Sequence, residues 1–365
     1  MRDTQEIEKS GNKVIYSEKV VVSFNKKKFR FSDWFAEKAI KAVAFLSIAI
    51  VILIFVFVFR EAFPIFRMDK SESASGELLV QESYAGDEAL NEPVKTTDNQ
   101  VDNSNKVQAT VVKPSSTLFS KTWMPVSDNP RYGLWPLFLG TLKVTVIALL
   151  FAAPVSILAA IYTAMFAKPR VREVIKPVIE LLAGFPSVVI GFFALMVLAT
   201  VFQDIFGYAS RLNAFVGGIA MGLAAIPIIY TLTEDALTAV PKTYTEASLG
   251  IGASRRQTAF YVVLPAAVPG IFAAVVLGTG RIFGETMIAL MATGNAAMIS
   301  MNPFESVRTL SATIGAEMAE VVFGDTHYSV LFLIGSLLFI FTFALNALAE
   351  FYFKNMVIRR YQSKK

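Results

Sequence analysis

The chain contains no cysteine and only one histidine, His327, among its 365 residues. Disulfide scaffolds, thiol chemistry and the cysteine- or histidine-rich sites that hold structural zinc are therefore excluded. A proton relay built from histidines has almost no material. The sequence also lacks a Gly-x-x-x-x-Gly-Lys-Ser/Thr phosphate loop, so this chain is not an ATPase of that type.

Apolar residues are abundant where these groups are missing. They make up 54% of the chain, and the mean hydropathy is +0.53, which indicates lipid as the main solvent. Runs long enough to cross about 30 Å of hydrocarbon recur along the sequence. We predict an all-α, polytopic membrane protein with about six spans, near residues 39–59, 137–166, 178–202, 213–238, 265–293 and 329–352.

The net charge of +5 is explained by where the basic residues lie. Lysine and arginine gather in the first 41 residues, in 168–176, in the loop that begins at Glu246 and after Lys354. These segments alternate with the spans, so the positive-inside rule places them and both termini in the cytoplasm. The basicity thus indicates topology rather than nucleic-acid binding. We interpret the first apolar run as a retained signal anchor, because it begins behind a long charged segment.

Composition divides the chain into five segments. The segment 61–132 is acidic and poor in apolar residues, so we expect a largely disordered external loop. The aromatic residues that return at Trp123 are typical of an interfacial belt ahead of the second span. The predicted segments are a cytoplasmic N-terminal segment 1–38, a first transmembrane helix 39–60, the external loop 61–132, a transmembrane domain 133–355 and a cytoplasmic basic tail 356–365.

A polar, basic segment, 239–264, lies between the fourth and fifth predicted spans. Its sequence predicts a helix–glycine–helix knuckle. A threonine, Thr243 or Thr245, caps the first helix with Glu246 in its first turn. Gly252 ends that helix in the left-handed conformation, and Ser254 caps a second helix that runs to Leu264, ahead of Pro265. Arg255 and Arg256 keep the knuckle out of the bilayer.

The spacing of Glu246-Ala247, Gly252 and Leu264-Pro265 resembles the cytoplasmic EAA loop of ABC-importer permeases. That resemblance implies that Glu246, Ala247 and Gly252 contact a groove of a separate ATPase subunit. Ser248 stands where the pattern often has alanine. The alternative is an ordinary basic loop between two spans.

A charge pair, Arg281 and Glu285, interrupts the fifth apolar run. The spacing of four places both residues on one face of a helix. A central arginine costs about 2.5–3.5 kcal/mol on insertion scales, so it is expected to face a partner or a cavity. Its planar fork suits an oxyanion, and the hydroxyls of Thr279 and Thr286 add donors. Phosphate still carries a proton that Glu285 can accept, whereas sulfate carries none. The alternative is a structural pair that locks two helices.

The string Leu277-Gly-Thr-Gly-Arg-Ile-Phe-Gly-Glu-Thr-Met287 resembles the signature of phosphate ABC-importer permeases of the PstC type. Residues 133–167, 180–191 and 308–318 are similar to other parts of that family. The resemblance implies a type I ABC-importer permease fold in the bacterial cytoplasmic membrane, with transport roles for Arg281 and Glu285. It also implies partners: a PstA-type sister permease, a PstB-type ATPase dimer that binds the ATP, and a soluble PstS-type phosphate-binding protein. No cofactor is expected in this chain itself.

Other functions stay open at this stage. The chain could be the PstA-type sister or a permease for another oxyanion, such as sulfate or molybdate. An ion-coupled secondary transporter would need more intramembrane acids, and a membrane enzyme would need a nucleophile and base that the spans lack.

Several charged residues outside these motifs receive simpler interpretations. We expect Lys143 to snorkel outward, and Glu234 and Asp235 to be solvated or to cap a helix. An acidic cluster near His327 is interpreted as a solvated helix face that contacts the binding protein, in preference to a metal site. Its members are Glu317, Glu320 and Asp325.

Overall fold

The computed structural model describes residues 31–67, 117–127 and 129–362. The chain divides into two compact units, Met1–Leu53 and Ile54–Lys365. Six helical stretches of the described residues are long and apolar enough to cross a membrane, which confirms the predicted number and the all-α class. They are Trp34–Phe66, Leu134–Phe166, Ser187–Phe206, Ala214–Thr238, Arg255–Phe283 and Thr326–Phe351.

The first helix, α1 (Phe31–Ala62), begins in the first unit and ends in the second. Within the second unit, Phe55 and Phe57 of α1 make edge contacts with Phe339 and Phe332 of α14. The short helix α2 (Pro64–Arg67) follows α1, and its Ile65 is buried. Residues 1–30 of the predicted N-terminal segment 1–38 and residues 68–116 of the predicted external loop 61–132 lie outside the described residues.

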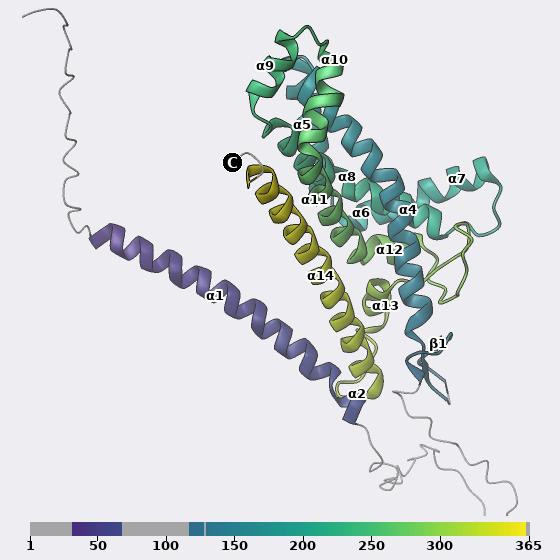
Figure 1. Ribbon diagram of the computed structural model, residues 1–365. Helices are drawn as coiled ribbons and strands as arrows, with labels where there is room; N and C mark the ends of the chain where they lie inside the picture. Colours follow the sequence, from purple (N-terminus) through teal and green to yellow (C-terminus); the bar gives the residue numbers. More distant parts are fainter. Residues whose placement is uncertain (1–30, 68–116, 128, 363–365) are drawn as a thin grey trace, which may run out of the picture. The chain divides into compact units, whose positions relative to one another are not determined.

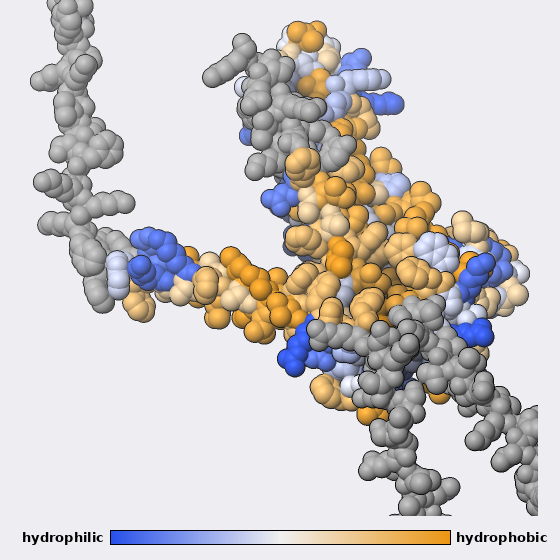
Figure 2. All heavy atoms as spheres, turned by 60° about the horizontal axis from the view of Figure 1, so that its bottom comes forward, coloured by the Kyte–Doolittle hydropathy of each residue, from blue (hydrophilic) through white to orange (hydrophobic). Residues whose placement is uncertain are grey.

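The centre of the second unit is an all-helical bundle. The long helix α4 (Leu134–Ile161), extended by the π-turn η1 (Tyr162–Phe166), packs against α8 (Ala214–Thr238). Small residues permit this close approach: a methyl group at Gly218 would lie 2.6 Å from Ile147. On α8 lies α11 (Leu264–Phe283), and on α11 lies α14 (Thr326–Gln362), as Figure 1 shows. Hydrophobic residues cover much of the bundle surface in Figure 2, as lipid contact requires.

Three of the four prolines within apolar runs, Pro154, Pro227 and Pro269, lie inside continuous helices. Pro186 instead ends one. The predicted span 178–202 is therefore wrong at its start, because Phe185 adopts an extended backbone ahead of Pro186, as residues before proline prefer.

The break at Pro186 separates two stretches. Before it lies the amphipathic helix α5 (Pro169–Gly184). After it the third span consists of α6 (Ser187–Phe193), the π-turn η2 (Ala194–Leu198) and α7 (Ala199–Phe206).

The end of the segment predicted to be disordered is folded. A two-stranded antiparallel hairpin pairs β1 (Trp123–Met124) with β2 (Arg131–Tyr132), Trp123 lying opposite Tyr132. Both aromatic side chains are buried in a cluster with Leu137, so the interfacial-belt interpretation is wrong for them. The apolar surface that α4 and α14 offer to this segment supplies the burial that its own composition lacks.

The fifth span also departs from the prediction, because the helix expected over 265–293 is broken. α11 ends at Phe283, and α12 (Met287–Ala292) follows after three residues that belong to neither helix. A loop that carries one parallel bridge, between Gly294 and Val307, then leads to α13 (Leu310–Glu317). At the opposite end of the bundle lie α9 (Lys242–Gly250), α10 (Arg255–Thr258) and the π-turn η3 (Ala259–Val263).

Candidate functional sites

The knuckle, residues 239–264, begins as a helix at Lys242. Its N-cap is Pro241, which makes no side-chain capping bond, so the predicted caps at Thr243 and Thr245 are wrong. Since the helix starts earlier than expected, Glu246 lies in its second turn rather than its first. The fixed φ of Pro241 already directs the chain into a helix, which makes a threonine cap unnecessary.

The turn between α9 and α10 follows the prediction. Gly252 has φ +91°, its amide donates to Leu249 O at 3.0 Å, and the Ala253 amide donates to Ser248 O at 3.2 Å. These bonds satisfy carbonyls that the helix end would otherwise leave open. Ser254 forms a full capping box with Gln257, with bonds of 3.3 and 2.8 Å.

The second arm of the knuckle does not stop at Pro265. Helical structure runs without a break from Arg255 through η3 into α11, because a local π-turn can accommodate the backbone groups that a proline frees within a membrane helix. The two arms are joined by a buried hydrogen bond of 2.9 Å between the hydroxyls of Ser248 and Thr258. Ser248, which stands where the loop pattern often has alanine, therefore holds the two helical arms of the knuckle together.

All five residues predicted for partner contact are exposed, namely Glu246, Ala247, Gly252, Arg255 and Arg256. Ile251 lies between them at the tip and is 87% exposed. An apolar tip flanked by charges suits a helix that docks into a groove, and Ile251 is a candidate contact residue beyond those predicted from the sequence. The structure thus brings the predicted residues together on one exposed element.

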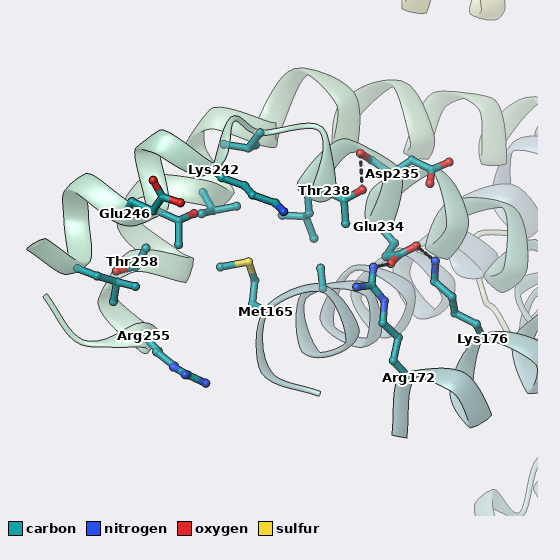
Figure 3. A pocket seen from close by; sticks show the side chains of 16 residues that line it. Met165, Arg172, Lys176, Glu234, Asp235, Thr238, Lys242, Glu246, Arg255 and Thr258 are labelled. Atoms are coloured by element: carbon teal, nitrogen blue, oxygen red, sulfur yellow. Dashed lines mark hydrogen bonds and ion pairs between the residues drawn. The ribbon is translucent and has the colours of Figure 1, made fainter. Parts of the chain in front are cut away.

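Behind the knuckle lies a cavity of about 640 Å³ (Figure 3). Glu246 and Arg255 line one part of it, and Glu234, Arg172 and Lys176 line another. Charges of both signs face this space, so the cavity has no strong preference for an anion or a cation.

Glu234 is not the solvated or capping residue that we predicted. It is 1% exposed and forms ion pairs with Arg172, and with Lys176 at 2.6 Å, both from α5. A buried carboxylate requires such partners. Its neighbour Asp235 is exposed, in agreement with the prediction. The spacing of Arg172 and Lys176 on one face of an amphipathic helix is the sequence signal that points to such an acidic partner.

At the helix break, Arg281 and Glu285 do not share a helical face. Arg281 is exposed in the last turn of α11, whereas half-buried Glu285 follows the helix end at Gly284. Within residues 129–362 the structure shows no ion pair between them. The predicted geometry is wrong because the helix ends, and both charged groups are left available to a third group.

Packing around the break fixes its backbone. The Ser311 hydroxyl of α13 donates to Glu285 O at 2.7 Å, and a methyl group at Gly315 would lie 2.6 Å from Thr286 Cγ2. Thr279 donates to its own helix at Val275 O, 2.8 Å away. Interrupted backbone inside an apolar span is tolerated where protein covers it or where it lines a cavity, so the break marks a candidate substrate path.

In the acidic cluster near His327, Glu320 and Asp325 are exposed, as predicted, whereas Glu317 is not on a solvated face. Glu317 is largely buried, accepts from Trp123 Nε1 at 3.0 Å and pairs with Arg308 and with His327 at 2.8 Å. Burial by itself raises the pKa of Glu317, but the bonds from His327 and Trp123 and the charge of Arg308 together hold it below the ordinary carboxyl range. No group of three potential metal ligands occurs among the described residues.

Lys143, predicted to snorkel, has fixed partners. Its ammonium donates to Ser300 O at 2.8 Å and to Asn302 O at 2.9 Å, in the loop that connects α12 to α13. The side chain does reach out of its span, and it anchors that loop.

Six apolar spans, an exposed helical knuckle and a break in the fifth span are the features of a multi-pass membrane protein with a docking element. The family described as "Binding-protein-dependent transport system inner membrane component" matches residues 152–357, more than half of the chain. The chain belongs to this family, and it is an ABC-importer permease subunit.

Individual relatives agree with this assignment. A "Probable ABC transporter permease protein YqgH" of Bacillus subtilis is 35% identical over 64% of this chain and 75% of its own length. A "Phosphate transport system permease protein PstC" of Mesorhizobium japonicum is 33% identical over 65% of this chain and 77% of its own length. A solved structure of the MetNI methionine ABC transporter, in inward-facing conformations, has 20% identity and a TM-score of 0.45, covering 60% of this chain and 94% of that one.

Proposed function

We propose that this chain moves inorganic phosphate inward across the bacterial cytoplasmic membrane, as the PstC-type permease of an ABC importer. The observation that best supports phosphate as the substrate concerns Arg281. Its guanidinium is exposed beside a helix break within an apolar span and has no ion-pair partner in the described residues. A relative named as a phosphate transport system permease, 33% identical to this chain, supports the same substrate class.

In this proposal Arg281 and Glu285 act on phosphate together. The guanidinium binds two phosphate oxygens in a bidentate manner, and the Glu285 carboxylate accepts the proton that phosphate still carries. Thr286, and Thr279 after rotation away from its helix, offer hydroxyls to the remaining oxygens. A phosphate held this way passes on when the two helix ends at the break separate.

The energy comes from partner chains. The knuckle, with Glu246, Ala247, Gly252, Arg255 and Arg256, docks into an ATPase dimer of the PstB type, which binds the ATP, so that this chain needs no cofactor. A PstA-type sister completes the path, and a PstS-type binding protein delivers phosphate at the opposite face. Both termini and the knuckle then lie in the cytoplasm, in agreement with the positive-inside rule.

The test is uptake of labelled phosphate by cells that carry the complete importer. Arg281→Ala is compared with wild type at equal membrane abundance, with excess unlabelled sulfate as competitor. Arg131→Ala, which removes an exposed arginine outside the spans, is the matched control. We expect sulfate to leave wild-type uptake unchanged, Arg281→Ala to abolish it and Arg131→Ala to retain it. Full uptake by Arg281→Ala would refute the site, and no uptake by wild type would refute phosphate as the substrate.

A further inference from the structure

Glu234 joins two helices at the base of the knuckle. One carboxylate oxygen pairs with Arg172 and the other with Lys176, so a single residue of α8 holds two residues of α5. Figure 3 shows the carboxylate between the two basic side chains. The glutamate side chain is 2% exposed, whereas the arginine and lysine side chains are 37% and 38% exposed.

Buried ion pairs of this kind often contribute no more stability than apolar packing of the same volume. A buried carboxylate loses its hydration, and well-packed hydrophobic residues often replace buried ion pairs without loss of stability. The ion pairs add geometric specificity, because two charge-assisted bonds hold α5 against α8 in a single register. The ion pairs therefore matter for which two helices they join, more than for the free energy of folding that they contribute.

The two helices lead to the two sites described above. On one side, α8 ends at Thr238 and passes through Pro241 into α9, which carries Glu246. On the other side, α5 passes through the break at Pro186 into α6.

From α6 the connection continues to the helix break. A methyl group at Gly191 of α6 would lie 3.3 Å from Ile288 Cα and Met287 O, so α6 packs directly on the backbone of α12. Helix α12 begins immediately after Glu285 and Thr286. A displacement of α5 is therefore passed to α6 through the chain connection at Pro186. It then reaches the break through the contact of α6 with α12.

We propose that Glu234, with Arg172 and Lys176, is a latch that transmits movement of the knuckle through α5 and α6 to the break at Glu285. Glu234 is a positioning residue and does not touch substrate. The proposal rests on the proposed function, since it requires an ATPase that moves the knuckle. A direct route also exists, because α8 packs on α11 where Ile229 meets Gly278, so the experiment has to separate the two routes.

The test measures phosphate transported per ATP hydrolysed by the complete importer in liposomes, with phosphate-loaded binding protein. Glu234→Gln preserves the shape of the side chain and removes both ion pairs. We expect this ratio to fall about tenfold, within the 5- to 150-fold range typical of coupling between sites, while ATP hydrolysis continues. The control Glu173→Gln changes an exposed carboxylate of α5, the helix that Glu234 binds, and should keep the wild-type ratio.

A double-mutant cycle tests whether the ion pairs act as one unit. We expect the ratio for Arg172→Gln/Lys176→Gln combined with Glu234→Gln to be no lower than that for Glu234→Gln alone. Losses that multiply would overturn the latch, as would an unchanged ratio in Glu234→Gln. Wild-type importer without ATP-driven phosphate uptake would instead overturn the proposed function.

A second measurement does not depend on how well Glu234→Gln folds. Because the chain has no cysteine, it can be purified and spin-labelled at Val174→Cys on α5 and Asp235→Cys on α8 without background labelling of its own residues, before the importer is assembled. Both positions are exposed. In the otherwise unchanged importer the distance between the labels should stay constant when ATP is added. A distance that changes with ATP would show that α5 does not follow α8, and would overturn the latch.

Discussion

Two glycines at the end of α9 permit a matched test of the knuckle's shape. A methyl group added at Gly250 or at Gly252 would meet no atom within 4 Å, so neither change to alanine creates a clash. The backbone separates them: Gly250 is the last residue of the helix, whereas Gly252 has φ +91°. The two alanine variants therefore differ only in the conformation that the alanine must adopt.

The expected free-energy changes have opposite signs. An L-residue pays about 1–2 kcal/mol in the left-handed conformation, so Gly252→Ala disfavours the turn. Alanine is favoured over glycine within a helix by roughly 0.5–1 kcal/mol, so Gly250→Ala stabilises α9. If docking requires the turn, then 1–2 kcal/mol corresponds to about a 5- to 30-fold weaker complex for Gly252→Ala.

The assay is the Kd of the ATPase subunit for the purified permease in detergent, followed by phosphate uptake in reconstituted liposomes. Gly252→Ala should weaken binding by this factor, and Gly250→Ala should bind at least as tightly as wild type. Wild-type binding by Gly252→Ala, or equal weakening by both variants, would refute the argument that the left-handed turn shapes the docking surface.

Two further predictions concern charged groups at the opposite ends of the bundle. Glu246→Lys should insert into the membrane normally and lose phosphate uptake, because the substitution reverses an exposed charge of the docking surface; retained uptake, measured at equal membrane abundance, would remove the coupling assignment. Glu317→Gln should lower the free energy of unfolding by about 1.5–3 kcal/mol at neutral pH, the usual contribution of a hydrogen bond to a charged group. Because the folded pKa of Glu317 is depressed, this stabilisation is present above the ordinary carboxyl pKa and is lost as pH falls through the folded value. Melting curves between neutral and acidic pH should therefore converge for wild type and Glu317→Gln, whereas the exposed Glu320→Gln should match wild type throughout; a constant difference would contradict the assignment.

The structure confirms most of the sequence predictions that rest on local rules. Apolar runs of sufficient length predict membrane spans, since the hydrocarbon core must be crossed whatever the helices pack against. Gly252 and Ser254 were predicted correctly because a left-handed turn and a capping box each depend on a few neighbouring residues. The predicted caps at Thr243 and Thr245 failed for the same kind of reason, since Pro241 already fixes the helix start.

Predictions about charged side chains failed more often. Glu234 was expected to be solvated, and Glu317 to lie on a solvated face, yet both are buried among partners far away in the sequence. Hydropathy assigns a charged residue near a span end to water, because it does not report which cation another element brings there. Arg281 and Glu285 were placed on one helical face, and the helix end at Phe283 separated them.

The sequence by itself determined that this chain is an α-helical membrane protein with an exposed glycine-centred knuckle, because hydrophobic length, loop charge and turn chemistry act over short distances. The tertiary structure decided which polar groups meet. It placed Glu234 between Arg172 and Lys176. It also buried the Trp123 hairpin against α4 and α14, and it ended α11 two residues after Arg281. These outcomes depend on the packing of helices that are distant in the chain, since that packing decides which buried charge finds a partner and where a helix ends.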